Sequence, residues 1–389
     1  MRKWPPKIPE LGDVVKKYID DDNPLSITDD SGIYLELEEE FSRIHGRKYA
    51  LLCSSGTAAL LSAYFALNLS KDDEVICTAF TYHATISPAL MFGVKIVFCD
   101  VEDDTGNINT SLIEDLITPK TKAIVTNDMW GHPCDKDKIT AICRKHNLRY
   151  IEDCSHAQFA KYRDRYTGTF GDIACWSFQS RKMIGGGEGG ILLTDDFRLY
   201  ERAVLFGHYS WRSLQTAKSS EYLPIAQTGF GLKFRMHPLS AVIVLHLIRN
   251  YAQKWIADRE ETLNYFSRQL ERYTPLKAMA RREYVKSMGG WYGFFPRMPD
   301  DVDRDEFIAF LKANDVKVKY SSCKILPYLP LFRMKDDGGK IVYSEIEQHF
   351  PAAERYERSI IGFPAFTEHE YDEIDRYVRI IAEYFTRRP

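Results

Sequence analysis

Residues 174–194 read ACWSFQSRKMIGGGEGGILLT, and this stretch holds two apolar runs separated by a polar, glycine-rich loop. The runs, 174–178 and 190–194, are short and lack polar alternation, which is typical of strands covered on both faces. The loop carries Lys182 ahead of its glycines, whereas a P-loop has its lysine after them. We therefore predict two core strands that flank a lysine.

Similar runs recur through the first 250 residues. They predict further strands at residues 49–53, 75–80, 95–101, 123–128 and 149–153. Helices are predicted between them, at residues 57–67, 85–92, 110–117 and 135–147. This alternation predicts an α/β fold with a mostly parallel seven-stranded sheet wrapped by helices. Ligands of such sheets bind at the carboxyl ends of the strands.

The pattern changes beyond Phe197. We predict a long helix at 238–259, then short strands at 291–296 and 316–320 and amphipathic helices at 304–314, 344–360 and 368–387. The chain is long enough for two domains, which we place at 1–254 (an N-terminal arm and a large domain) and 255–389 (a small α+β domain). Residues 336–340, DDGGK, predict a surface turn.

The bulk composition argues against several classes of protein. The 389 residues are 44% hydrophobic and 28% charged, as in a soluble globular protein. The net charge of −3 gives no reason to expect binding to nucleic acid or to an acidic membrane. No apolar run approaches the ~18 residues of a membrane-spanning helix, and the first residues lack the apolar core of a signal peptide. We expect a cytoplasmic location.

The eight cysteines indicate neither a disulfide framework nor a metal cluster. They form no C-x-x-C pair, and five of them lie in or beside apolar runs (Cys53, Cys77, Cys99, Cys154 and Cys175). Reduced, buried thiols are the better interpretation. We predict no metal site, because the spacings of metal ligands are absent.

A candidate phosphate site lies in LLCSSGTAAL, residues 51–60, where a predicted strand runs directly into a helix. The free N–H groups and the positive dipole end of a helix start bind phosphate well. The hydroxyls of Ser55 and Thr57 can add donors, and Gly56 permits close approach of the backbone. The alternative is that Ser55 or Thr57 only caps the helix.

Two more strand ends carry polar or aromatic side chains. In RYIEDCSHA, residues 149–157, Asp153 ends an apolar strand and His156 follows three residues later. Asp153 can pair with the protonated ring nitrogen of a cofactor or cap the next helix, and His156 can face the same cavity or be an ordinary core histidine. In TAFTYHAT, residues 78–85, Tyr82 or His83 can stack on a ligand ring, although such aromatics are more often core.

Taken together, these residues meet the needs of pyridoxal 5'-phosphate. That cofactor requires a phosphate anchor, an anion opposite its pyridinium nitrogen, a ring contact and a lysine. Burial lowers the pKa of a lysine, and the free amine forms a Schiff base with an aldehyde. An exposed turn lysine is the alternative for Lys182.

The succession SSGTAAL, TAFTYHAT, IEDCSHA, SFQSRKMIGGGEGG and GFGLKFRMHPLSA resembles the DegT/StrS-type sugar aminotransferases. The likeness covers residues 30–250 and continues more loosely to residue 380. It implies a fold-type I, pyridoxal-phosphate-dependent aminotransferase that works as a homodimer with shared active sites. The wording of residues 231–238, GLKFRMHP, is most similar to the branch that aminates cyclitol ketones such as scyllo-inosose derivatives.

The resemblance also implies a role for each matching residue. Lys182 would bind the cofactor and shuttle protons, and Asp153 would pair with the pyridine nitrogen. His156 would lie near the phenolic oxygen, and Tyr82 over the ring. The phosphate would be held by Ser177, Gly56 and Thr57. Lys233 takes the place of an asparagine that the partner subunit usually provides for the phosphate.

The implied reaction moves an amino group from L-glutamine or L-glutamate to the ketone of a sugar or cyclitol, in amino-sugar or antibiotic biosynthesis. The acceptor can be free, phosphorylated or nucleotide-linked, and we expect contacts to it from residues 130–132, 208–211 and 320–328. Two alternatives are a related dehydratase of keto-deoxysugars and a binding or regulatory protein on the same scaffold. Known dehydratases that resemble the family have histidine where this chain has Lys182.

Overall fold

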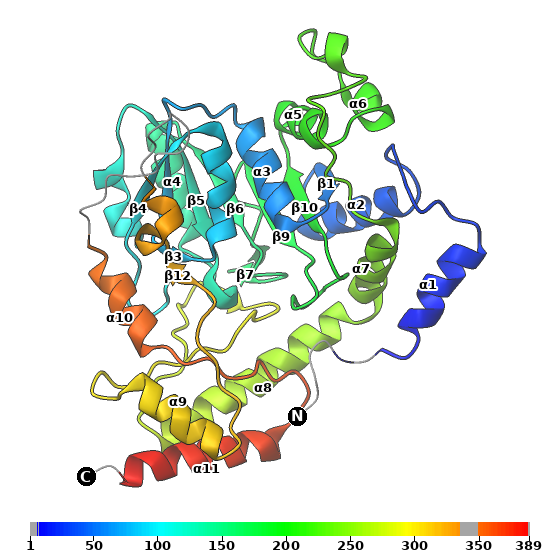
Figure 1. Ribbon diagram of the computed structural model, residues 1–389. Coiled ribbons are helices and arrows are strands. Elements are labelled where there is room, and N and C mark those ends of the chain that lie inside the picture. The colour runs from blue at the N-terminus through cyan, green and yellow to red at the C-terminus, as the bar shows by residue number, and fades with distance from the viewer. Residues whose placement is uncertain (1–5, 7, 335–348, 388–389) are drawn as a thin grey trace.

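The computed structural model describes residues 6, 8–334 and 349–387 (Figure 1). The predicted turn at 336–340 lies outside the described residues, as does the first part of the predicted helix at 344–360. The helices are α1 (Leu11–Asp20), α2 (Gly32–His45), α3 (Gly56–Ala66), α4 (Lys136–His146), α5 (Phe197–Gly207), α6 (Trp211–Thr216), α7 (Pro238–Asn250), α8 (Ala252–Tyr273), α9 (Arg304–Ala313), α10 (Pro351–Ser359) and α11 (Tyr371–Arg387). None of the helices in the described part of the chain is long and apolar enough to cross a membrane.

The main sheet has seven strands, in the order β1-β10-β9-β6-β5-β2-β4. Their bounds are β1 (Tyr49–Cys53), β2 (Glu74–Thr78), β4 (Lys95–Cys99), β5 (Thr121–Asn127), β6 (Arg149–Asp153), β9 (Ile173–Ser177) and β10 (Gly190–Thr194). The five strands from β9 to β4 pair in parallel, and β10 is antiparallel to both of its neighbours. The predicted α/β fold with a mostly parallel seven-stranded sheet is confirmed.

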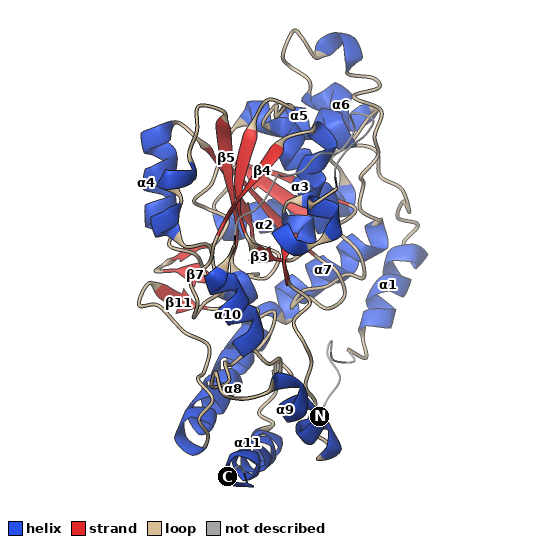
Figure 2. Ribbon diagram, turned by 60° about the vertical axis from the view of Figure 1, so that its left-hand side comes forward, coloured by secondary structure: helices blue, strands red, loops and turns tan. Residues whose placement is uncertain are grey.

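Helices cover both faces of this sheet, as Figure 2 shows. In β1, Leu51 and Cys53 pack into one apolar core with α3 and α5, whereas Ala50 and Leu52 pack into another with α2 and α7. Successive side chains of a strand point to opposite faces, so a strand buried on both sides must be apolar throughout. This double burial explains the unbroken apolar runs in the sequence.

Small pairings of strands lie outside the main sheet. They are β3 (Phe80–Thr81) with β12 (Lys324–Ile325), and β7 (Lys161–Tyr162) between β8 (Arg165–Tyr166) and β11 (Val285–Ser287). The strands predicted at 291–296 and 316–320 are wrong as strands. Within these segments the structure has only the isolated bridges Phe294–Phe363 and Lys319–Gly362.

Three helix predictions also need correction. The segments predicted as helices at 85–92 and 110–117 contain short 3-10 turns. Pro88 interrupts the first segment and Gly93 ends it, and Pro119 follows the second. The single helix predicted at 238–259 is two helices, α7 and α8, which meet at Tyr251 with a φ of −126°. The Tyr251 hydroxyl donates to Glu10, and this contact fixes the junction against the N-terminal segment.

A second apolar core lies away from the sheet, among α8, α9 and α11 (bottom of Figure 1). It includes Leu263, Phe266, Phe307, Ile374 and Tyr377, all of them buried. The predicted domain boundary at residues 254 and 255 falls within the first turn of α8. The division into a large and a small domain therefore stays a prediction.

Candidate functional site

Lys182 lies in the loop between β9 and β10, and its backbone is anchored from a distant segment. The side-chain amide of Gln158 donates to the carbonyl oxygens of Ser177, at 2.9 Å, and Ile184, at 3.0 Å. The N–H of Ile184 donates back to Gln158 at 2.8 Å. Lys182 is only 8% exposed, so it is not the solvated turn lysine that was the alternative.

The amine of Lys182 is held among aromatic and acidic groups. Its Nζ lies 3.7 Å from the ring centroid of Tyr292. Burial lowers the pKa of Lys182 to about 8, and the negative charge of Asp153 opposes this change. At pH 7 about a tenth of this amine is therefore unprotonated and nucleophilic, far more than for an ordinary lysine.

This pKa leads to a measurable pH dependence. The rate at which added pyridoxal phosphate attaches to the cofactor-free protein should rise with pH and reach half its maximum near pH 8, because only the free amine attacks an aldehyde. The rate can be followed by absorbance in a stopped-flow instrument from about pH 6 to pH 10. A midpoint near the ordinary lysine value of 10.5 would contradict the buried setting of Lys182.

Asp153 ends β6 at the carboxyl edge of the sheet and is 3% exposed. Its Oδ2 accepts a hydrogen bond from the Thr85 hydroxyl at 2.7 Å, and its Oδ1 accepts one from the N–H of Ser155 at 3.0 Å. These bonds fix the orientation of the carboxylate. Thr85 belongs to the quoted TAFTYHAT motif but was given no role, because a hydroxyl contact across 68 residues leaves no local signal in a sequence.

His156 completes the group around Lys182. Its ring stacks on Tyr292, with centroids 4.1 Å apart, and also lies near the ring of Trp130, at 5.3 Å. Burial lowers the pKa of His156 well below its usual value, and the cation of Lys182 acts in the same direction. Its Nδ1 is buried and has no hydrogen-bond partner among the described residues. A neutral imidazole with a free nitrogen suits a polar ligand atom beside Lys182, and this fits pyridoxal phosphate.

The predicted phosphate residues gather where α3 begins. Ser55 caps α3, since its Oγ accepts the N–H of Ala58 at 3.0 Å. The start of the helix lies against the ends of β9 and β10: a Cβ at Gly56 would lie 2.8 Å from the Ser177 Cβ, and one at Gly190 would lie 2.5 Å from the backbone of Ser55. The capping interpretation holds for Ser55, while the first N–H groups of α3, at Gly56 and Thr57, have no acceptor within the helix.

Two predicted residues are not brought against Lys182. Tyr82 is 44% exposed and its ring lies beside His83, at 4.6 Å, whereas the aromatic ring next to the amine is that of Tyr292. The place of Tyr82 over the cofactor ring stays a prediction. Lys233 is exposed and its backbone bridges to His208. The only sequence signal for Tyr292 was an aromatic residue in a segment assigned as a short strand.

Of the predicted acceptor segments, 130–132 is interior. Trp130 and His132 are each 1% exposed. The indole N–H of Trp130 donates to the Tyr356 hydroxyl at 3.1 Å, and His132 is held by the side chain of Asn107 at 3.0 Å. The ring of Trp130 packs near that of His156. Because both Trp130 and His132 are buried, neither offers a free surface to a substrate.

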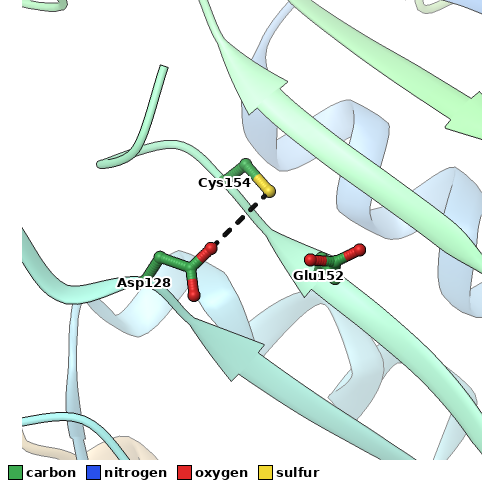
Figure 3. A group of neighbouring side chains, drawn as sticks. All are labelled: Asp128, Glu152 and Cys154. Carbon is green, nitrogen blue, oxygen red and sulfur yellow. Dashed lines mark hydrogen bonds between the residues drawn. The ribbon is translucent and has the colours of Figure 1, made fainter. Parts of the chain in front are cut away.

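One group in the described part of the chain has the side chains of a metal site, namely Asp128, Glu152 and Cys154 (Figure 3). The ammonium of Lys136 lies 2.6 Å from Asp128 and 3.0 Å from Glu152. A cation that belongs to the protein therefore already neutralises these carboxylates, and we assign no metal to them.

The fold and this site define a class of protein. The structure superposes on an aminotransferase from Psychrobacter cryohalolentis with a TM-score of 0.84 and 27% identity, over 99% of this chain and 98% of that one. It also superposes, with a TM-score of 0.84 and 22% identity over 98% of each chain, on a GDP-4-keto-6-deoxymannose-3-dehydratase that holds a trapped PLP-glutamate geminal diamine. The architecture is that of the fold-type I transferases that depend on pyridoxal phosphate.

The chain belongs to the DegT/DnrJ/EryC1/StrS aminotransferase family, whose profile matches residues 29–382. It is 33% identical to the GDP-perosamine synthase of Escherichia coli O157:H7 over 271 residues, 69% of this chain and 72% of that one. It is also 33% identical to a putative L-glutamine:3-amino-2,3-dideoxy-scyllo-inosose aminotransferase of Micromonospora echinospora over 249 residues, 64% of this chain and 58% of that one. The cyclitol branch is thus one distant relative among several sugar aminotransferases.

Proposed function

We propose that this protein is a pyridoxal-phosphate-dependent aminotransferase that moves an amino group from L-glutamine or L-glutamate to the ketone of a sugar. The observation that carries the proposal is the buried amine of Lys182. The negative charge of Asp153 raises the pKa of this amine, and His156, whose Nδ1 has no hydrogen-bond partner among the described residues, lies beside it. When bound, pyridoxal phosphate accepts the electrons released as the donor loses its α-proton. Membership of the family supports this reaction type.

Each residue near Lys182 takes a defined part. With pyridoxal phosphate bound, Lys182 would hold it, and the free amine of Lys182 would take the α-proton of the donor as a general base. Asp153 would keep a proton on the ring nitrogen, and the Nδ1 of His156 would serve the phenolic oxygen. The start of α3 holds the phosphate, with Ser177, Ser55, Gly56 and Thr57 as its contacts.

We further propose a homodimer in which Lys233 contacts the phosphate of the partner subunit. The side chain of Lys233 makes no hydrogen bond or ion pair with the residues described, and the backbone of Phe234 accepts a hydrogen bond from Ser54 at 2.5 Å. The nearby projecting segment around α6 exposes large apolar side chains, as a subunit interface requires: Trp211, Leu214, Leu223, Phe230 and Leu232 (top of Figure 1).

The proposal is tested by mass spectrometry of products formed from a set of keto-sugars, with glutamine or glutamate as the donor. An amino-sugar together with the keto acid of the donor supports it, and ping-pong kinetics are expected. A deoxy-sugar would instead identify a dehydratase. A protein that stays colourless after addition of pyridoxal phosphate would be a binding or regulatory protein on this scaffold.

Asp153→Asn should lower amino transfer about a hundredfold or more, because it removes the charge that keeps the ring nitrogen protonated. The amide oxygen can still accept the N–H of Ser155, and the amide N–H₂ can donate to the Thr85 hydroxyl, so the fold should be retained. Initial rates measured with both substrates saturating test this expectation. Asp195→Asn, at an exposed position at the opposite edge of the sheet, serves as the control and should keep its activity.

A further inference from the structure

Two hydrogen bonds reach the Asp153 carboxylate from the described part of the chain, and a donor supplies each of them. The Thr85 hydroxyl donates to Oδ2 at 2.7 Å, and the backbone N–H of Ser155 donates to Oδ1 at 3.0 Å. An ionised carboxylate only accepts hydrogen bonds, whereas a protonated one also needs an acceptor for its own hydrogen. Because Asp153 is only 3% exposed, these two donors take over the stabilisation of its charge that water would otherwise provide.

The Thr85 hydroxyl is itself oriented by a second hydroxyl. The Oγ1 atoms of Thr85 and Thr81 lie 3.0 Å apart, and both side chains are buried. A hydroxyl has a single hydrogen, so if Thr85 gives its hydrogen to Asp153, Thr81 must give its own to Thr85. The result is a directed chain of two hydroxyls that ends on the carboxylate. Hydrogen bonds in such a chain polarise and strengthen one another, and this chain favours the anion.

The backbone of Thr85 is fixed from two other parts of the site. The Tyr64 hydroxyl, buried in α3, donates to the Thr85 carbonyl oxygen, and the N–H of Thr85 donates to the Tyr82 carbonyl at 3.1 Å. The start of α3 is the predicted phosphate seat, and Tyr82 is the predicted ring contact. Thr85 therefore links Asp153 to the helix and to the turn that carry these other candidate residues, and a fixed backbone presents its hydroxyl to the carboxylate.

We propose that Thr85 is a positioning residue for amino transfer: its hydroxyl, directed by that of Thr81, keeps Asp153 an oriented anion and so keeps a proton on the ring nitrogen of bound pyridoxal phosphate. This inference rests on the proposed function and adds to it a residue that acts through Asp153. Without the Thr85 hydroxyl, Asp153 becomes a stronger base and competes for the proton of the ring nitrogen. A ring that has lost this proton accepts electrons less well.

The test compares Thr85→Val, which removes the hydroxyl and keeps the shape of the side chain, with Thr85→Ser, which keeps the hydroxyl. Pyridoxal phosphate labelled with ¹⁵N in its ring is bound to each protein, and the chemical shift of this nitrogen reports whether it is protonated. We expect a protonated ring nitrogen in the parent and in Thr85→Ser, and a shift toward the neutral form in Thr85→Val. The kcat of Thr85→Val should fall about ten- to a hundredfold, as expected for the loss of a hydrogen bond to a charged group, while the KM for the donor changes less.

Thr194→Val is the matched control. Thr194 is another buried threonine, and its hydroxyl donates to the Asp172 carbonyl at 2.8 Å, at the opposite edge of the sheet. This variant should keep the nitrogen signal and the kcat of the parent. Urea unfolding of all the variants separates a loss of stability from a loss of function, since a purely structural role of Thr85 would lower the urea midpoint and leave the ring nitrogen protonated.

Two outcomes of the nitrogen measurement would overturn the inference: a ring nitrogen that is neutral in the parent, or one that stays protonated in Thr85→Val. A Thr85→Ser protein as impaired as Thr85→Val would also overturn it, because the methyl group and not the hydroxyl would then matter. Failure of the proposed function is recognised in the parent protein instead. If borohydride reduction leaves no pyridoxyl label on Lys182 there, both proposals fall, whatever the Thr85 variants show.

Discussion

Replacing Lys182 with alanine is expected to lower amino transfer by at least about a thousandfold and to abolish covalent retention of pyridoxal phosphate. In the proposed function the variant loses both the amine that would bind the cofactor and the general base for the α-proton, and general base catalysis alone contributes ~10²–10⁴-fold. The remaining cavity is still lined by Tyr292 and His156, so non-covalent binding of the cofactor can persist. Amino transfer is measured with the best donor and acceptor found in the substrate screen.

Peptide mapping after borohydride reduction gives an independent result for the same variant. In the parent protein a pyridoxyl group should be found on the peptide that contains Lys182, and in Lys182→Ala on no peptide. Lys120→Ala is a suitable control, because Lys120 is an exposed lysine of the same domain, just before β5. Full activity in Lys182→Ala, or a label on a different lysine, would show that the chemistry lies elsewhere.

The sheet was predictable because burial on both faces leaves a plain signature. The bounds predicted for β1, β6 and β10 are those observed, and Asp153 and Lys182 follow from them as residues at the carboxyl edge. The helices predicted at 85–92 and 110–117 were not recoverable in the same way. Each lies next to a proline or a glycine. Their apolar residues indicate that the segments are buried, but do not distinguish a 3-10 helix from an α-helix.

Several residues of the candidate site could not be predicted from the sequence. Tyr292, Thr85 and Lys319 contact the neighbourhood of Lys182 from segments that the tertiary fold brings together, so no spacing in the chain relates them to the glycine-rich loop. Tyr82 was predicted as a ring contact because its motif stands at a strand end, whereas Tyr292 was given no role. In the structure, the ring next to the amine of Lys182 comes from beyond α8.

Lys136→Met should destabilise the fold by about 3–5 kcal/mol, because it leaves two buried carboxylates without their cation. Lys136 is completely buried, and its ammonium contacts Asp128 at 2.6 Å, Glu152 at 3.0 Å and the Tyr150 hydroxyl at 3.2 Å. Burial opposes the charge, but the carboxylates, Asp128 foremost, raise the pKa of Lys136 well above its usual value. Methionine fills nearly the same volume, so the loss measured in urea reports the charge.

The same cluster bears on the active site, since Glu152 is next to Asp153 in β6 and the N–H of Asp128 donates to the Asp153 carbonyl at 3.4 Å. The destabilisation by Lys136→Met should shrink as the pH falls. Burial already raises the pKa of Asp128, and without Lys136 the folded state binds protons more tightly than the unfolded chain does. Low pH therefore favours folding of the variant. Lys138→Met, which breaks only an exposed contact to Asp135, should change little. A stable Lys136→Met protein whose stability does not depend on pH would contradict this account, because its carboxylates would then bind protons equally in the folded and unfolded states. Lys136 would in that case not hold the strand end that carries Asp153.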